Sequence, residues 1–284
     1  MKRILLFLLP LTALLSCHSD HKKANNDTLN KTNAGTNQVL SKETLALIGK
    51  FKPIIQGVWV KADYLEKIKE TKSPLAASSF ASWITTLFIN CDSIKGDELK
   101  VLAGYGNHDS GDVTIKFEHG KKPETILFDD HDLSYTISNG DTVLFLPQFD
   151  ERKKIYFSRK YVRVLSKQPT DNFGYGIYLA VNKAVIAGNY LFTDTLGNKK
   201  KVRFNDDGKL IGFPDFYSYQ INIDFNDLYD NLDVITLQGK IKHFMSYSFK
   251  INADTLNLYT TKENADSISL SIDKLKYKLV REKP

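Results

Sequence analysis

The chain has 284 residues, of which 42% are hydrophobic and 25% are charged. This length predicts one or two domains, and the composition is that of an ordinary soluble globular protein. The formal net charge of +6 is dispersed, and its densest run, Lys199 to Lys201, follows Gly197-Asn198 as a solvated turn would. A dispersed excess of this size argues against a nucleic-acid partner.

The first residues of the chain, MKRILLFLLPLTALLSC, have the composition of a secretory signal peptide. Lys2 and Arg3 form a basic start. The apolar stretch from Ile4 to Leu15 is too short to span a bilayer, which takes ~20 residues. We therefore expect residues 1–17 to direct export.

The end of this segment, Leu14-Leu15-Ser16-Cys17, resembles the lipobox of bacterial lipoproteins. The resemblance implies that the Cys17 thiol is alkylated with diacylglycerol, that the preceding peptide is removed, and that the new amino terminus is acylated, for example with palmitate. Several acyl chains together give stable membrane anchoring. His18 stands where an Asp favours the inner membrane, so the same resemblance implies the outer membrane. The alternative is an ordinary secretory peptide with a cysteine at its cleavage site.

Cys91 is the one other cysteine, so no intramolecular disulfide is possible once Cys17 is lipidated. It lies in LFINCDS on the same alternating side as Leu87 and Ile89, which indicates a buried, inert thiol. A catalytic thiol needs a nearby base and an electropositive setting, whereas the neighbour here is Asp92.

Residues 18–40 are polar and carry too little apolar surface to fold, so they predict a flexible tether. Ser41 is the predicted N-cap of a short helix that ends between Gly49 and Pro53.

After this helix, the hydrophobic period changes to two. Val113, Ile115 and Phe117 alternate with polar residues in VTIKFEH, and SYQINIDF (218–225) and SISLSI show the same pattern. One buried and one solvated face are typical of antiparallel sheets. Asn139-Gly140 predicts a type I′ hairpin. We therefore predict an all-β protein.

One segment interrupts the strands with a helical period. ADYLEKIKETKSP (62–74) has Leu65 and Ile68 on one side and lysines and glutamates on the other sides. The segment ends in the Ser-Pro pair at 73–74. We expect a helical insert here.

The two halves of the chain resemble each other. IIQGVW (54–59) matches VIAGNY (185–190), and the strand KYVRVL (160–165) matches KYKLVR (276–281). The spacing leaves room for about eight short strands in each half, although chance similarity between strand-rich segments is the alternative. The predicted domains are 41–168, with the helical insert 62–82, and 169–284.

A Gly-x-Trp in a first strand with a basic residue in the last strand resembles lipocalins and lipocalin-like families. The resemblance implies that the ring plugs the closed end of a barrel and that an arginine lies across it, a contact of ~0.5–2 kcal/mol. The second half departs from the pattern, because a Tyr replaces the Trp. The residues expected to close the barrels are Gly57, Trp59, Arg163, Gly188, Tyr190 and Arg281. The expected fold is thus two tandem antiparallel lipocalin-like barrels or sandwiches.

The densest cluster of acids and histidine is Phe128 to Asp132. A metal site would need three or four converging ligands, with His108 and Asp109 as candidates to join it. A solvated hairpin turn is the simpler interpretation, and a short polar loop accounts equally well for the acids of 227–233. We predict no metal, no catalytic residue and no cofactor.

An aromatic patch in the second half is the candidate ligand contact, and its members are Phe213, Phe216, Tyr217 and Tyr219. Aromatic rings with polar tips line many ligand sites and also fill cores, so both interpretations stay open. Gly174-Tyr175-Gly176, between the two halves, predicts a hinge.

The sequence thus predicts an exported, lipid-anchored outer-membrane lipoprotein that acts as a binding module rather than an enzyme. The first hypothesis is a small hydrophobic ligand inside one or both barrels, because a barrel of about eight strands either holds one small ligand or is filled by side chains. The second is an interaction with an envelope protein, as a structural factor or an inhibitor. The third is a hydrolase of envelope glycans or lipids that uses the acids at 128–132 or 227–233.

Overall fold

The structure is a computed structural model that describes residues 39–150, 152–169, 171–194, 196–226, 231–239, 243–265 and 269–283. Cys17 and the predicted tether as far as residue 38 lie outside the described residues. All described helices and strands belong to one compact unit, residues 39–284. This unit contains both hydrophobic cores, so it has what it needs to fold on its own.

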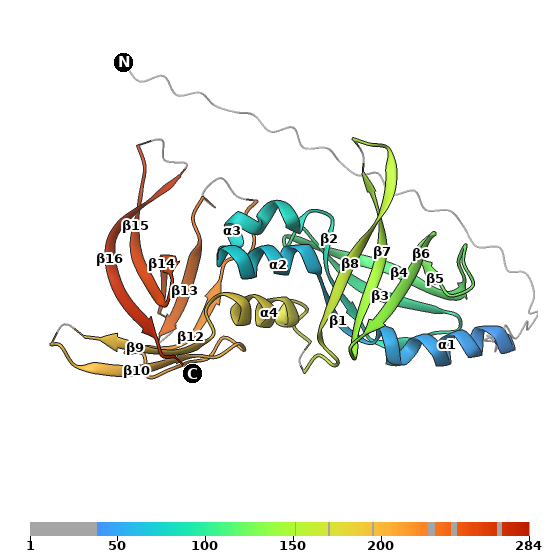
Figure 1. The fold of residues 1–284 in the computed structure, drawn as a ribbon, viewed down its shortest axis with the longest axis horizontal. Coiled ribbons are helices and arrows are strands. Elements are labelled where there is room, and N and C mark those ends of the chain that lie inside the picture. Colours follow the sequence, from blue (N-terminus) through green and yellow to red (C-terminus); the bar gives the residue numbers. More distant parts are fainter. Residues whose placement is uncertain are drawn as a thin grey trace, which may run out of the picture. The chain divides into compact units, whose positions relative to one another are not determined.

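The first sheet closes on itself as a barrel (Figure 1). Each strand pairs antiparallel with the next, and the last strand pairs with the first. Its strands are β1 (Gly57–Lys61), β2 (Ile84–Ile89), β3 (Glu98–Tyr105), β4 (Asp109–His119), β5 (Ile126–Phe128), β6 (His131–Ser138), β7 (Asp141–Asp150) and β8 (Ile155–Leu165).

The second sheet repeats this plan without complete closure. Its strands are β9 (Gly188–Thr193), β10 (Lys199–Phe204), β11 (Leu210–Ile211), β12 (Phe216–Ile221), β13 (Val234–Gly239), β14 (Phe244–Asn252), β15 (Thr255–Glu263) and β16 (Leu270–Arg281). The last strand, β16, pairs with the first, β9, as β8 does with β1. The edge strands β11 and β12 approach each other through a single bridge between Lys209 and Ser218. The sheet is therefore nearly closed.

These two sheets confirm the predicted fold class. The alternating pattern of β4 buries Val113, Ile115 and Phe117, as expected. Asn139 and Gly140 form the turn between β6 and β7 with positive φ angles of 53° and 83°, as a type I′ hairpin requires. Lys199 to Lys201 are exposed, but they begin strand β10 rather than forming a turn.

Within the described residues, four α-helices accompany the sheets: α1 (Lys42–Ile55), α2 (Ala62–Thr71), α3 (Pro74–Ala77) and α4 (Tyr175–Val185). Short 3-10 turns occur at Ser78–Ala81 and Cys91–Ser93. The Ser41 hydroxyl caps α1 by accepting from the Thr44 N–H at 3.0 Å. This helix continues through Pro53, beyond its predicted end, because Phe51 and Ile55 are both buried in the first barrel. Tertiary packing here outweighs the low helix propensity of proline.

Helix α4 was not predicted, and the hinge expected at Gly174-Tyr175-Gly176 is wrong. Gly174 is the N-cap of α4, and the next two residues form its first turn. A side chain at position 176 would meet the Val58 side chain, with a Cβ 2.6 Å from Val58 Cγ1. The glycine therefore allows α4 to pack directly on β1.

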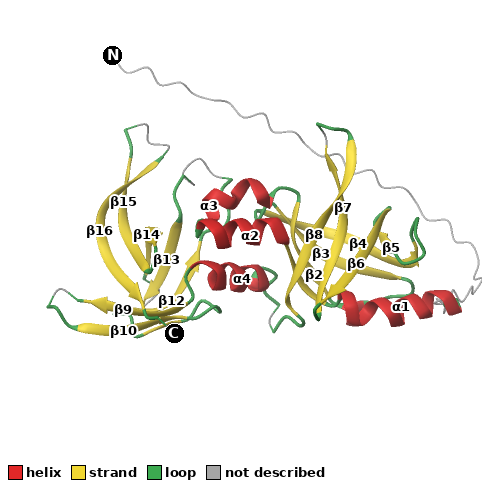
Figure 2. Cartoon of the chain, viewed as in Figure 1, coloured by secondary structure: helices red, strands yellow, loops and turns green. Residues whose placement is uncertain are grey.

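Two hydrophobic cores follow from this arrangement. One lies inside the closed barrel and includes side chains of α1. The other covers the inner face of the second sheet and continues over α2, α3 and α4. Helix α4 contacts β1 and β8 of the first sheet and β12 of the second, so α4, with α2 and α3 beside it, lies between the two sheets (Figure 2).

Gly57 is the position where the backbone most clearly requires glycine. Its φ is +126°, and an added Cβ would overlap the Leu165 carbonyl oxygen of β8. Gly57→Ala should therefore lower the free energy of unfolding by about 2 kcal/mol or more, measured by urea denaturation of residues 39–284.

Gly49→Ala is the matched control, because Gly49 lies in α1 with open space around it. There the same substitution should be neutral or stabilise by about 0.5–1 kcal/mol. Equal, small effects at both positions would contradict the close approach of β1 and β8.

Candidate functional site

Trp59 is fully buried where β1 follows α1. Its indole Nε1 donates a hydrogen bond of 2.7 Å to the carbonyl oxygen of Ile55. Arg163 lies opposite Trp59 in the strand register, with its guanidinium carbon 4.8 Å from the centre of the indole ring. Its Nη2 donates to the carbonyl oxygen of Ile54 at 2.6 Å. Trp59 and Arg163 thus donate hydrogen bonds to the last two carbonyl groups of α1.

Tyr190 and Arg281 repeat this arrangement in the second sheet. The two residues are register partners, and the guanidinium carbon lies 5.0 Å from the centre of the phenol ring. The Tyr190 hydroxyl donates to the carbonyl oxygen of Ile186 at 2.7 Å, four residues earlier. Arg281 Nη1 donates to the carbonyl oxygen of Ala187 at 2.9 Å. These carbonyls lie at the end of α4.

The chemistry of a helix end explains both pairs. The last carbonyls of a helix have no partner within it and carry partial negative charge, so a donor and a cation stabilise them. An indole N–H can only donate, whereas a phenol hydroxyl can donate and accept. Arg281 Nη2 accordingly donates to the Tyr190 hydroxyl at 2.6 Å, while Arg163 stacks on Trp59. The change from Trp to Tyr keeps the function of the pair and alters its geometry.

The inner faces of both sheets carry large buried side chains. In the first barrel Phe117, Leu144 and Tyr161 are fully buried, and the Tyr161 hydroxyl donates to the carbonyl oxygen of Ile84 at 2.7 Å. In the second sheet Phe204 packs edge-on against Tyr190, with ring centres 5.4 Å apart. Large buried side chains thus pack against the inner faces of both sheets, and a ligand inside either sheet stays a prediction.

The predicted aromatic patch divides between core and surface. Phe213 and Tyr219 are buried, and the rings of Phe213 and Phe216 stack with centres 5.8 Å apart. The Tyr219 hydroxyl donates to the carbonyl oxygen of Asn205 at 2.6 Å. Tyr217 is 48% exposed. Contact of these four residues with a ligand stays a prediction. The packing of Phe213, Phe216 and Tyr219 favours a place in the core.

The candidate site is a cleft of about 940 Å³ outside the barrels. Helices α2 and α4 form two sides, and the turn between β6 and β7 and the outward face of β7 and β8 form the rest. The volume is within the range typical of sites for small ligands. Its apolar lining consists of Leu65, Val143, Val162, Val164, Leu179, Ala180 and Ala184.

The charged lining of this cleft is mainly basic. Lys69, Lys72, Arg163 and Lys183 line it, against the single acid Asp141. Lys72 Nζ donates to the carbonyl oxygen of Ala184 at 2.6 Å, in the last turn of α4. Burial lowers the pKa of Lys72, and the charges of Arg281 and Lys69 lower it further. The cleft therefore combines an apolar floor with a positive potential.

Lys69 and Lys183 are the two most accessible of these cations. Both are exposed, and no carboxylate of the described ranges lies within ion-pair distance of either one. Their positive charge is thus available to an anionic group in the cleft.

The acid and histidine cluster at 128–132 forms a hairpin turn. Asp129 and Asp130 connect β5 to β6, and the Asp129 carboxylate accepts from the Thr114 N–H at 2.9 Å. The Asp132 carboxylate accepts instead from the Lys121 N–H at 2.8 Å. Each carboxylate is thus held by a separate backbone donor. Within the described part of the chain, no three acid, histidine or cysteine side chains are placed to share a metal ion.

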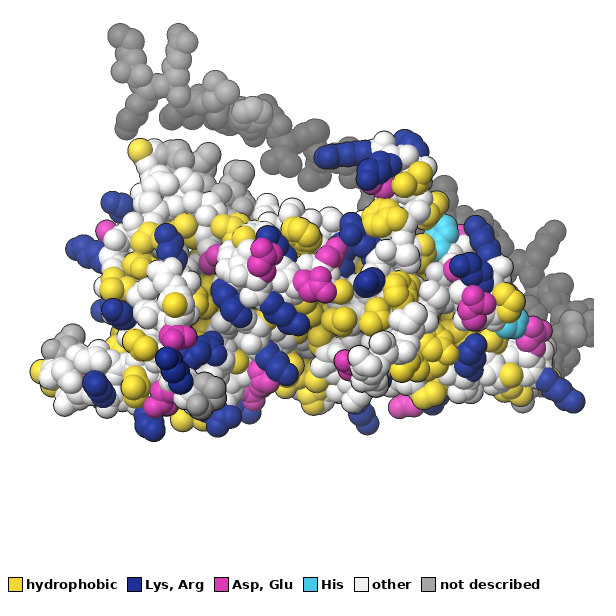
Figure 3. All heavy atoms as spheres, in the orientation of Figure 1, with side chains coloured by type: hydrophobic (Ala, Val, Ile, Leu, Met, Phe, Trp, Pro, Cys, Tyr) yellow, Lys and Arg dark blue, Asp and Glu magenta, His cyan; other side chains and the backbone are white. Residues whose placement is uncertain are grey.

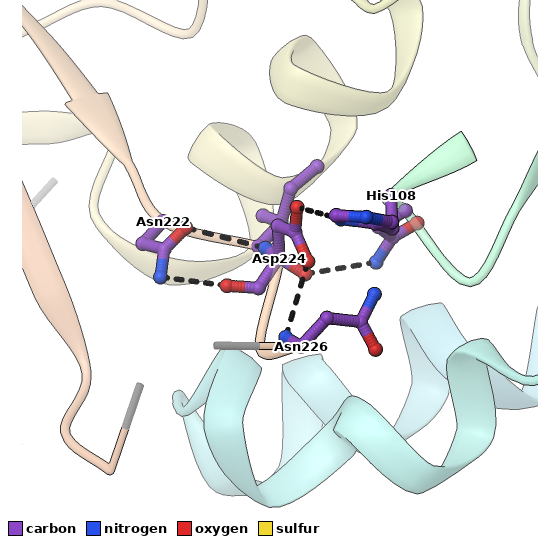
Figure 4. A network of polar contacts seen from close by, with 6 residues as sticks. His108, Asn222, Asp224 and Asn226 are labelled. Atoms are coloured by element: carbon purple, nitrogen blue, oxygen red, sulfur yellow. Dashed lines mark hydrogen bonds and ion pairs between the residues drawn. The ribbon is translucent and has the colours of Figure 1, made fainter. Parts of the chain in front are cut away.

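His108 does not join this cluster and instead faces the second half of the chain. Figure 4 shows its ring pointing toward Asp224, with Nδ1 2.7 Å from a carboxylate oxygen. The other carboxylate oxygen accepts from the Asn226 N–H at 3.2 Å. Asn107, the neighbour of His108, donates to the Tyr64 hydroxyl and to the Ile223 carbonyl. These contacts join the β3–β4 turn to the segment after β12.

Of the acids at 227–233, residues 227–230 lie outside the described residues and Asp233 lies within them. Its carboxylate accepts from the Ser73 hydroxyl at 2.5 Å and from the Leu75 N–H at 2.9 Å, at the start of α3. Burial raises the pKa of Asp233. This acid therefore has a structural contact with the helical insert.

Cys91 is buried, and burial raises the pKa of its thiol to about 11.

Sequence reasoning did not find the cleft. Lys69 and Lys72 were placed on the polar side of the predicted helical insert, where they read as ordinary solvated charges. Leu179 and Lys183 belong to α4, which had not been recognised. The available signal was the four-residue spacing of Ile177, Val181 and Val185, all buried on α4.

Comparisons with known proteins do not assign the chain to a family. No protein-family model matches the chain, and no curated protein shows significant similarity to it. Among the described residues, none of the helices has both the length and the apolar character needed to cross a bilayer.

The hydroxyl of Tyr190 should contribute measurably to stability. Tyr190→Phe removes the bond to Ile186 and the acceptor of Arg281, and it should lower the free energy of unfolding by about 1–3 kcal/mol. Tyr217→Phe is the matched control on an exposed ring, and its effect should stay within about 0.5 kcal/mol. Chemical denaturation of both variants checks this. Equal stabilities would show that the hydroxyl does not hold the end of α4.

Proposed function

We propose that this protein is an exported, lipid-anchored binding module that takes a small amphiphilic ligand in the cleft between α2, α4 and β7–β8. The observation that carries the proposal is the combination in one cleft of about 940 Å³ of an apolar floor and a basic lining. The large buried side chains on the inner faces of the sheets favour this cleft over the inside of either barrel.

The chemistry of the lining defines the ligand class. Valine, leucine and alanine side chains on α4 and β8 suit a hydrocarbon part, because burial of apolar surface is worth about 25 cal/mol per Å². Lys69 and Lys183 at the accessible side suit a carboxylate or phosphate head group. The expected ligand is therefore an amphiphilic anion with a single short chain.

The cellular location is proposed from the sequence alone. The signal-like start and the Leu-Leu-Ser-Cys17 motif support a lipid anchor, and His18 supports the outer membrane. Such an anchor would keep the cleft near a source of amphiphiles.

Binding can be measured on purified residues 39–284, which lack Cys17. Native mass spectrometry should detect a copurified ligand as an additional mass that denaturation removes. If no ligand copurifies, or after it has been removed, the protein should bind added dodecanoate. Ala180→Trp should weaken dodecanoate binding at least tenfold, because Ala180 lies in the cleft and the indole would fill it. Dodecanol, which lacks the charge, should bind more weakly than dodecanoate.

The matched control is Ala76→Trp, which introduces the same side chain at an exposed position of α3. This variant should bind dodecanoate as the parent does. If neither copurified amphiphile nor dodecanoate binding is found, the small-ligand proposal is wrong. Crosslinking to an envelope protein would then be the next measurement.

A further inference from the structure

The β7–β8 hairpin projects beyond the rest of the first barrel (Figure 1). The pairing of β6 with β7 ends at Phe145, and the pairing of β1 with β8 ends at Tyr161. Beyond these points β7 and β8 pair only with each other, as far as Asp150 and Ile155. Leu146 still belongs to the barrel core, and the Tyr156 ring lies against His131 of β6 with ring centres 4.5 Å apart. From Pro147 outward the hairpin is otherwise a two-stranded ribbon, and such ribbons are marginally stable in water.

The end of this ribbon exposes large apolar side chains. Phe149 is 36% exposed, Ile155 52% and Tyr156 58%. The Phe149 and Tyr156 rings pack against each other across the two strands, with centres 4.9 Å apart. Single exposed apolar residues are ordinary, but a group of them at one projecting tip indicates a contact surface.

Basic residues surround the same tip. Arg152, Lys153 and Lys154 follow one another between the two strands and are exposed. Figure 3 shows dark blue and yellow side chains together on this projection. The Asp150 carboxylate accepts from the backbone N–H groups of Arg152 and Lys153, both at 3.0 Å, so it shapes the turn.

The charge of the hairpin is also distinctive. Residues 141–165 contain six basic and three acidic residues, an excess of three positive charges, against an excess of six for the whole chain. Arg163 lies over Trp59 and Arg159 pairs with Asp63, so the exposed cations at the tip are Arg152, Lys153 and Lys154. Their excess over the acids of residues 149–156 is one positive charge. The complementary surface is anionic.

We infer that the tip of this hairpin, defined by Phe149, Arg152, Lys153, Lys154, Ile155 and Tyr156, docks on an anionic lipid surface. Aromatic rings are favoured at the level of lipid head groups, and lysine and arginine interact with anionic lipids while their stems lie along apolar surface. A convex tip suits a flat and deformable surface better than it suits a pocket. Under the proposed lipid anchor, the tip would be a second attachment point that orients the protein.

The test uses residues 39–284 without an anchor and sedimentation with vesicles of two compositions. One is pure phosphatidylcholine, and the other contains phosphatidylcholine and phosphatidylglycerol at about 7:3. The protein should bind the anionic vesicles, and binding should weaken as salt is raised because surface charges are screened. Binding should be much weaker to the neutral vesicles.

Two variants of the tip should each weaken binding about tenfold or more. The first replaces the three cations (Arg152→Gln, Lys153→Gln and Lys154→Gln), and the second replaces the apolar pair (Ile155→Ser and Tyr156→Ser). The matched control replaces a second run of three exposed cations on β10 (Lys199→Gln, Lys200→Gln and Lys201→Gln). This β10 variant should change vesicle binding about twofold or less. That result is expected if the location of the charges, rather than their number, determines binding.

Each variant must keep its thermal stability and its dodecanoate binding, which separates this inference from the proposed cleft. The inference is overturned if the parent does not bind anionic vesicles or binds both compositions equally. It is also overturned if the β10 variant loses as much binding as the tip variants.

Discussion

The end of a helix is the constraint on which both halves of this molecule depend. Helices α1 and α4 each end immediately before the first strand of a sheet. The carbonyl groups at these helix ends accept buried or half-buried hydrogen bonds. An aromatic donor four residues on and an arginine from the last strand satisfy those carbonyls in each half. Because first and last strands are joined at this point, the same contacts that end the helix also bring the sheet toward closure. Glycine two residues before the ring makes the close approach possible.

This solution has a consequence for function. Trp59, Tyr190 and the neighbouring core residues pack large side chains on the inner faces of the sheets. The helices between the sheets then create the concave surface instead. Lys72 contributes to both features, since it lines the cleft and donates to the last turn of α4. The proposed ligand site is thus a product of how the two halves are joined, and neither sheet alone would form it.

Much of the fold could be predicted from local pattern. Alternation in segments such as 113–119 predicted the antiparallel strands, Asn139-Gly140 predicted its turn, and the Gly-x-aromatic repeats drew attention to Trp59 and Tyr190. Helix α4 was missed because glycine stands at its N-cap, Gly174, and in its first turn, Gly176. Glycine lowers helix propensity, and packing against Val58 explains it only at position 176. The cleft was missed for a related reason: Lys69 and Val164 are 95 positions apart in the sequence, and nothing local indicates that they meet.

Methyl NMR of residues 39–284 during titration with dodecanoate tests whether the ligand binds in the cleft and leaves the interiors of both sheets unchanged. Binding in the cleft should shift mainly the methyl resonances of Val143, Val162, Val164 and Leu179, which line the cleft. The methyl groups of the interior residues Leu87, Leu99, Leu144 and Leu258 should stay unchanged. Shifts at the interior groups with none in the cleft would contradict the account and place the ligand inside a barrel.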